Sequence, residues 1–264
     1  MRKTALITGA TSGIGRAYAS ALAARGYHLI LTGRRRQVLE EVAHTLSQTY
    51  HVLVTVCIVD FKDTLSFNRF VNFIKTQDTL EILVNNAGYG LEKSFLEDAL
   101  DTQLEMLQVH VIASITLCHI VANQLKASKR KGAIINVCSL AAFTPLPSSG
   151  MYCGTKHFLI QFSESLAMEL IPYGIRVQAL CPGFVHTDFH SRLAIPKEAC
   201  KNIGIVTWMG AEEVVYASLQ GLHRNQVFLI PGFLNQVCYQ LLKGMPRQIY
   251  FKIVSRYNRI FTPK

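Results

Sequence analysis

Seven short apolar runs alternate with longer stretches that have a helical pattern. The runs cover residues 3–8, 28–32, 51–60, 81–85, 132–139, 175–181 and 227–230. Because they are apolar throughout, they are typical of strands buried on both faces of a sheet. The helical stretches lie near residues 13–25, 35–48, 64–76, 101–126, 153–171 and 211–223. This alternation predicts an α/β fold, a doubly wound parallel sheet of about seven strands with helices on both faces.

A glycine-rich turn, TGATSGIG at residues 8–15, joins the first predicted strand to the first helix. Ligands of such sheets bind at the carboxyl ends of the strands, and helix N-termini attract phosphate. The absence of side chains at Gly9, Gly13 and Gly15 would let backbone N–H groups approach a pyrophosphate. The alternative is a tight connection without a ligand. The spacing differs from the common G-x-G-x-x-G, and the turn has no P-loop lysine.

Composition indicates one globular unit in a reducing compartment. The 264 residues are 50% apolar and contain no linker, repeat or low-complexity tract. The seven cysteines, an odd number without C-x-x-C spacing, are expected to be free thiols. We find neither a secretory signal nor an uninterrupted apolar run of about 18 residues, so the expected location is the cytoplasm.

Five short motifs follow one another at predicted strand ends. They are T-G-x-x-x-G-I-G at 8–15, N-N-A-G at 85–88, a serine at 139, Y-x-x-x-K at 152–156 and P-G-x-x-x-T at 182–187. With these motifs the chain resembles the short-chain dehydrogenases/reductases from residue 3 to about 232. The resemblance implies a Rossmann-type dinucleotide-binding catalytic domain over residues 1–235, including a substrate lid at about 186–210. A basic extension would cover residues 236–264.

The Y-x-x-x-K spacing occurs three times, beginning at Tyr89, Tyr152 and Tyr239. Only Tyr152 opens a helix shortly after a strand-ending Ser139, so these two residues can meet at one sheet edge. Lys156 shares the helix face of Tyr152, and a neighbouring ammonium would favour ionisation of the tyrosine. The resemblance implies that Tyr152 is the general acid/base and that Ser139 orients the substrate oxygen. It also implies that Tyr152 and Lys156 contact the nicotinamide ribose.

The resemblance places a nicotinamide dinucleotide along the strand ends. Asp60 would meet the adenine, although it could instead be a helix N-cap. From the pyrophosphate to the nicotinamide, the other implied contacts are Gly9, Ser12, Gly13, Ile14, Gly15, Asn86, Ala87, Gly88, Pro182, Gly183, Val185 and Thr187. No metal site is predicted.

The end of the second strand bears on the choice between NAD and NADP. NAD sites usually carry an acid there for the ribose 2′-hydroxyl, whereas NADP needs a cation for the 2′-phosphate. Residues 32–36 read Thr-Gly-Arg-Arg-Arg, and no acid occurs before Glu40. This favours NADP(H), with Arg34 as the residue that reads the phosphate. The alternative is a solvated arginine run.

One position departs from the family pattern. The family usually has an asparagine for proton relay in the helix after N-N-A-G, and His110 of LQVHVIASITL takes that place. Imidazole can donate and accept protons, so His110 could serve the relay. It could equally be a buried packing residue, and the sequence leaves both interpretations open.

The segment 248–261 is predicted to form a basic amphipathic helix. Most of its apolar residues fall on one arc, while Lys252, Arg256 and Arg259 cluster elsewhere. No acid follows Glu213, so most of the formal charge of +10 belongs to this end. The apolar arc could pack on the sheet domain, on a second copy in a homo-oligomer, or on an anionic membrane surface. Nucleic acid is not an expected partner, because basic and aromatic residues are not interleaved elsewhere.

The expected substrate is a hydrophobic carbonyl or alcohol. The predicted lid and the residues Phe143, Leu146 and Met151 near Tyr152 are largely apolar. Residues 13–34 also resemble the subgroup that contains long-chain 3-oxoacyl and steroid reductases. The leading interpretation is an NADP(H)-dependent oxidoreductase that works mainly as a reductase. The alternative is a nonenzymatic NADP(H)-binding or membrane-associated protein on the same fold.

Overall fold

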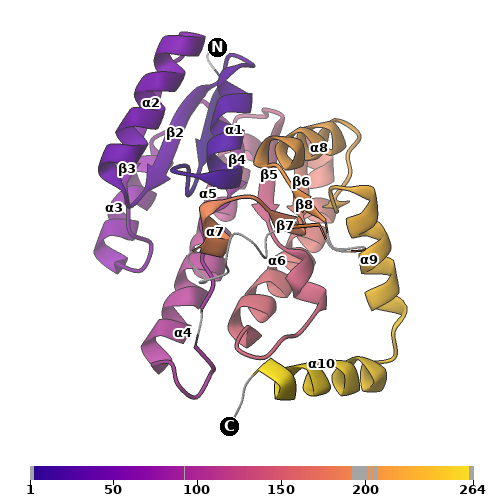
Figure 1. The fold of residues 1–264 in the computed structure, drawn as a ribbon. Helices are drawn as coiled ribbons and strands as arrows, with labels where there is room; N and C mark the ends of the chain where they lie inside the picture. Colours follow the sequence, from indigo (N-terminus) through magenta and orange to yellow (C-terminus); the bar gives the residue numbers. More distant parts are fainter. Residues whose placement is uncertain (1–2, 92, 192–200, 203, 205–206, 262–264) are drawn as a thin grey trace.

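A seven-stranded parallel sheet forms the centre of the protein (Figure 1). The computed structural model describes residues 3–91, 93–191, 201–202, 204 and 207–261. The strand order is β3-β2-β1-β4-β5-β6-β9, which confirms the predicted doubly wound fold. The strands are β1 (Thr4–Ile7), β2 (His28–Gly33), β3 (Val54–Ile58), β4 (Leu80–Asn85), β5 (Gly132–Val137), β6 (Ile175–Leu180) and β9 (Phe228–Leu229).

Helices cover both faces of this sheet, which explains why its strands are apolar throughout. Successive residues of one strand enter opposite cores, as Ala5 and Ile7 do on one side and Leu6 on the other. One core contains α1 (Gly13–Ala23), α2 (Arg36–Tyr50) and α8 (Ala211–His223). The other contains α3 (Thr64–Lys75), α5 (Ala113–Ala127) and part of α6 (Gly150–Leu170).

The predicted helix near 101–126 is interrupted. Its first part, α4 (Leu100–Leu107), passes into a π-helical turn at Gln108–Ile112 before α5 begins. The whole run Leu100–Ala127 is long and apolar enough to cross a membrane, but 56% of its most apolar window is buried inside the fold. It therefore has the burial of a core helix.

The loops at the carboxyl ends of the strands carry the motifs. A short 3-10 helix (Leu140–Phe143) follows β5, and β7 (Phe184–Val185) and α7 (Asp188–Ser191) follow β6. β7 pairs with β8 (Trp208–Met209) in a separate two-stranded sheet. The predicted lid runs through this region, but its residues 192–200, 203 and 205–206 lie outside the described part of the chain.

The C-terminal segment forms two helices, α9 (Phe233–Gly244) and α10 (Arg247–Phe261). The expected domain boundary at residue 235 falls inside α9, which we did not predict as a helix. In Figure 1, α9 descends beside the sheet and α10 runs beneath α6. Tyr250 of α10 is buried, and its hydroxyl donates a hydrogen bond of 3.0 Å to the Pro145 carbonyl. The C-terminal segment therefore packs on the loop that leads into α6.

Candidate active site

A cavity of about 1040 Å³ opens at the carboxyl ends of the parallel strands. It brings together residues from all five sequence motifs, although the first and last of these residues, Gly9 and Thr187, are 178 positions apart in the chain. They meet because the carboxyl ends of parallel strands lie at one edge of the sheet. Of the predicted site residues, only Gly15 and His110 do not line it. The predicted lining residues are Gly9, Ser12, Gly13, Ile14, Arg34, Asp60, Asn86, Ala87, Gly88, Ser139, Tyr152, Lys156, Pro182, Gly183, Val185 and Thr187.

The glycine turn is shaped by close packing as well as by its place at the cavity. Gly13 has φ of 54°, and a Cβ there would lie 2.7 Å from Thr187 Cγ2. A Cβ on Gly15 would lie 2.3 Å from the Gly9 carbonyl oxygen. Gly15 therefore does not line the cavity. Its lack of a side chain allows the backbone of Gly9 to pack against the first turn of α1. The tight turn holds the P-G-x-x-x-T segment against the start of α1.

The start of α1 fits a pyrophosphate. Ser12 is the N-cap residue, but its side chain makes no capping hydrogen bond, and the first turn of α1 carries no acid. Ser12, Gly13 and Ile14 all line the cavity. A helix N-terminus without a side-chain cap has backbone N–H groups available for an anion, and the helix dipole favours negative charge there.

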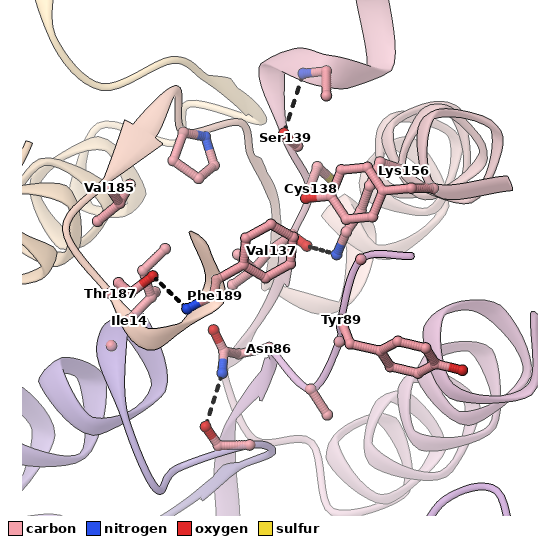
Figure 2. A pocket seen from close by; sticks show the side chains of 18 of the residues that line it. Ile14, Asn86, Tyr89, Val137, Cys138, Ser139, Lys156, Val185, Thr187 and Phe189 are labelled. Carbon is pink, nitrogen blue, oxygen red and sulfur yellow. Dashed lines mark hydrogen bonds between the residues drawn. The ribbon is translucent and has the colours of Figure 1, made fainter. Parts of the chain in front are cut away.

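Ser139, Tyr152 and Lys156 lie on two neighbouring elements at the cavity. Figure 2 shows the side chains of Ser139 and Lys156. Ser139 caps the 3-10 helix after β5, and its hydroxyl accepts a hydrogen bond from the Ala141 N–H at 3.1 Å. Tyr152 is in the first turn of α6, where its ring packs 5.6 Å from that of Phe189. Lys156 is buried, and its Nζ donates to the Val137 carbonyl at 2.7 Å. The end of β5 and the first turns of α6 thus bring these three side chains to the same part of the cavity.

Burial dominates the acid–base properties of these groups. It raises the pKa of Tyr152 to about 12, against a smaller lowering by interaction with Ser139. Burial also lowers the pKa of Lys156. The direction for Tyr152 is opposite to the one expected from a neighbouring ammonium. The reason is that burial of the Tyr152 hydroxyl disfavours its charged form more strongly than its neighbours favour it. Lys156 Nζ lies 5.8 Å from the centroid of the Tyr152 ring.

His110 lies behind the cavity wall and uses both of its ring nitrogens. Nε2 accepts a hydrogen bond of 3.1 Å from the Tyr89 N–H, and Nδ1 lies 2.9 Å from Thr155 Oγ1. The Thr155 hydroxyl donates to the Tyr152 carbonyl, so it accepts from His110. These roles place the single proton of a neutral imidazole on Nδ1. His110 thereby links the N-N-A-G loop to the first turn of α6, and its part in proton relay stays a prediction.

The burial of His110 predicts a pH dependence of stability. Burial and the charge of Lys156 hold its pKa well below 6.5, so the folded protein keeps the imidazole neutral while the unfolded chain takes up a proton. Stability is therefore lost as the pH falls below about 6.5. Between pH 7.5 and 5.5 we expect His110 to account for a loss of about 1.4 kcal/mol in the free energy of unfolding.

Urea unfolding of wild type and His110→Asn at both pH values measures this loss. The asparagine variant, whose side chain does not titrate, should lose about 1.4 kcal/mol less than wild type over that interval. Equal losses in the two proteins would show that His110 does not titrate between the folded and unfolded states as its burial requires.

The three consecutive arginines have different surroundings. Arg34 is exposed at the cavity and has no ion-pair partner among the described residues. Arg35 donates to the Thr11 hydroxyl at 2.8 Å and the Ser12 hydroxyl at 3.1 Å, and its Nη1 lies 3.4 Å from Asp188 Oδ2. Arg36 pairs with Glu40 on the surface. Arg35 is a cavity residue that the sequence analysis did not single out, although it stands in the same run.

Asp60 was expected either to meet the adenine or to be a helix N-cap. Asp60 does not cap α3, because the N-cap is Asp63, whose side chain accepts from the Leu65 N–H at 2.9 Å. Asp60 lines the cavity instead and accepts a hydrogen bond from the Lys62 N–H.

The other two tyrosines that begin a Y-x-x-x-K sequence lie in different surroundings. The ring centroid of Tyr239 is 4.7 Å from that of Phe143. Tyr89 lines the cavity, and its ring is directed toward the helices (Figure 2).

The part of the cavity that α9 lines contains residues that the sequence did not indicate. Asn235, Cys238 and Leu242 of α9 line it opposite the loop between the 3-10 helix and α6. That loop contributes Thr144, Leu146 and Ser149. The apolar spacing in FLNQVCYQLLKG, residues 233–244, would have predicted this helix.

Comparisons with known proteins agree with this geometry. The pattern of the family described as short chain dehydrogenase matches residues 3–197. The very-long-chain 3-oxoacyl-CoA reductase of Rattus norvegicus is 31% identical over 97% of this chain and 79% of its own length. A short-chain dehydrogenase from Sphingobium yanoikuyae, solved in complex with NADPH, is 28% identical, with a TM-score of 0.81 over 92% of this chain and 96% of its own.

Other relatives are longer than the region they share with this chain. Hydroxysteroid dehydrogenase-like protein 1 of Gallus gallus is 36% identical over 69% of this chain and 56% of its own length. A protein of Pongo abelii named inactive hydroxysteroid dehydrogenase-like protein 1 is 32% identical over 70% of this chain and 56% of its own length. The chain thus spans about half the length of these two relatives.

Proposed function

The chain belongs to the short-chain dehydrogenase family, and we propose that it is an NADP(H)-dependent oxidoreductase that works mainly as a reductase of a hydrophobic carbonyl. The observation that carries this proposal is the convergence of Ser139, Tyr152 and Lys156 on the cavity that also holds the glycine turn. The reductase relative and the NADPH-bound structural neighbour support it.

The protein residues supply the proton and orient the substrate. A nicotinamide cofactor bound along the strand ends would supply or accept the hydride. With its pKa raised to about 12, the Tyr152 hydroxyl is protonated at neutral pH and can donate to the substrate oxygen as negative charge develops there. The Ser139 hydroxyl holds that oxygen by a hydrogen bond. The Lys156 ammonium stabilises the phenolate left on Tyr152.

The preference for NADP(H) rests on Arg34. Its guanidinium is exposed at the cavity beside the end of β2, where the adenosine ribose binds in this type of fold. No acid stands at this strand end to accept from a ribose 2′-hydroxyl. A guanidinium can bind a 2′-phosphate in bidentate fashion.

The proposal of a hydrophobic substrate rests on the apolar side chains that line the cavity. Leu140, Leu146, Phe189 and Leu242 line the cavity together with Cys238, and Phe189 packs on the ring of Tyr152. Such a lining favours an apolar group beside the reacting carbonyl. Long-chain 3-oxoacyl compounds and steroids are the classes that this pocket would accept.

We also propose a homo-oligomer in the cytoplasm. Large apolar side chains are exposed on the outer faces of the helices that cover one side of the sheet, and they include Leu104, Ile112, Phe158 and Met168. Apolar surface of this kind is typical of a contact between copies of a chain.

One titration series tests the function. NADPH and NADH are titrated into the protein, and NADPH oxidation is then measured with long-chain 3-oxoacyl, steroid and simple aromatic carbonyls. The proposal expects tighter binding of NADPH and turnover of at least one apolar carbonyl. Tight binding without turnover of any compound would favour the nonenzymatic alternative, which His110 at the relay position and the relative named inactive make worth testing.

A further inference from the structure

The helices α9 and α10 carry both apolar and cationic side chains that are exposed. Leu241 of α9 is 56% exposed, and Ile249 and Ile253 of α10 are 52% and 51% exposed. Cationic side chains on the same two helices are also exposed, namely Lys243, Arg247, Lys252 and Arg256. We call these seven residues the α9–α10 surface. Packing inside the protein would bury the leucine and isoleucine side chains, and a surface that contacts only water would favour polar residues in their place.

α10 is attached to the rest of the protein by only part of its apolar arc. Tyr250 is buried and Val254, four residues later, is half-buried, so they form the contact with the fold. Ile249 and Ile253 are also four residues apart and lie on the flank of that contact. The apolar arc predicted from the sequence is therefore wider than the area that α10 buries, and its flank faces outward.

Within the described part of the chain, no acidic side chain pairs with the cations of this surface. None of the ion pairs among the described residues involves α9 or α10. The sequence has no acid after Glu213. A second copy of the chain placed symmetrically against this surface would bring the same cations together, which is unfavourable.

The surface borders the substrate end of the cavity. Leu242 lines the cavity and Leu241, its neighbour in α9, belongs to the α9–α10 surface. The Tyr250 hydroxyl is bonded to the Pro145 carbonyl, and Pro145 stands between two cavity-lining residues, Thr144 and Leu146. Leu146 is itself exposed. The C-terminal helices thus border the cavity through Leu242 and through the loop that Tyr250 contacts.

We propose that the α9–α10 surface docks on an anionic lipid membrane and that the cavity takes its apolar carbonyl substrate from that membrane. Exposed isoleucine and leucine side chains match the acyl region just below the headgroups, and the cations match anionic headgroups. The second part of the proposal, which concerns the substrate, rests on the proposed function. The first part does not depend on catalysis.

Partitioning of the full chain with vesicles tests the docking. The probes are phosphatidylcholine vesicles with and without an equal share of phosphatidylglycerol, assayed by co-sedimentation. We expect binding to the anionic vesicles that weakens at least about tenfold in Lys252→Glu/Arg256→Glu. The control Arg69→Glu/Lys75→Glu changes the net charge equally on exposed residues of α3 and should bind like wild type.

A second variant tests the apolar component. Ile249→Ser/Ile253→Ser keeps every charge and should also weaken binding to anionic vesicles, because it removes the side chains that would enter the acyl region. If both α10 variants partition like wild type, docking through this surface is wrong. If the serine variant instead lowers the particle mass measured by light scattering without vesicles, the surface binds a second copy of the chain.

Turnover separates this inference from the proposed function. Wild type and the α10 variants should oxidise NADPH equally with a short, water-soluble carbonyl, because the reacting groups are unchanged. With a long-chain 3-oxo compound carried in anionic vesicles, the variants should be slower in proportion to their lost binding. Equal rates there would overturn membrane delivery, whereas binding without turnover of either substrate would overturn the proposed function alone.

Discussion

Replacing Tyr152 with phenylalanine is expected to lower NADPH-dependent turnover by at least about 100-fold. The substitution removes the hydroxyl that donates the proton and keeps the ring that packs against Phe189. Because Tyr152 contributes its hydroxyl to the reacting oxygen and not to the pyrophosphate site, NADPH should bind nearly as in wild type. Steady-state kinetics with the best substrate and an NADPH titration measure the two effects.

Tyr239→Phe is the matched control for this variant. Tyr239 begins another Y-x-x-x-K sequence, but its ring packs on Phe143 and it does not line the cavity. This variant should keep near-normal turnover. If Tyr152→Phe also kept near-normal turnover, Tyr152 would not be the general acid, and another proton donor would have to be sought at the cavity.

Replacing Arg34 with alanine is expected to weaken NADPH binding by about 10- to 100-fold and to change NADH binding little. The cofactors differ by the 2′-phosphate, and the exposed guanidinium at the end of β2 is the group proposed to bind it. Titration of both cofactors into wild type and Arg34→Ala measures the ratio of their affinities. An equal loss for NADPH and NADH would mean that Arg34 does not read the 2′-phosphate.

The neighbouring arginines provide two controls with different expected results. Arg36 pairs with Glu40 on the surface, so Arg36→Ala should leave both affinities unchanged. Arg35 holds the Thr11 and Ser12 side chains of the glycine turn. Arg35→Ala should therefore weaken both cofactors together, because the turn serves the pyrophosphate that they share.

The sequence was sufficient to predict the sheet because its signals are local. Each strand is a continuous apolar run, and parallel strands in alternation with helices allow few arrangements. The same reasoning placed every predicted site residue except Gly15 and His110 at the cavity, since the motifs directly follow strands and the strand ends lie at one edge. Thr187 and Gly13 meet in the structure although 174 positions separate their numbers in the chain.

Properties that depend on long-range contacts could not be predicted in the same way. Lys156 was expected to act on Tyr152, but the path of its side chain depends on the Val137 carbonyl of another element. The hydrogen bonds of His110 depend on the π-helical turn, which changes the direction of the helix face there. The contact between Arg35 and Asp188 depends on α7, which comes more than 150 positions later in the chain.

The strand order has a consequence for how the chain assembles. β1, β2, β3 and β4 are contiguous in the sheet, and all four lie within residues 4–85. During synthesis, half of the sheet can therefore pair before β5, β6 and β9 leave the ribosome. Because every pairing in the sheet is parallel, no local hairpin can start this process, and each pairing must wait for a complete crossover. We therefore expect these first four strands to expose the β4 edge of the unfinished sheet to chaperones until β5 is synthesised.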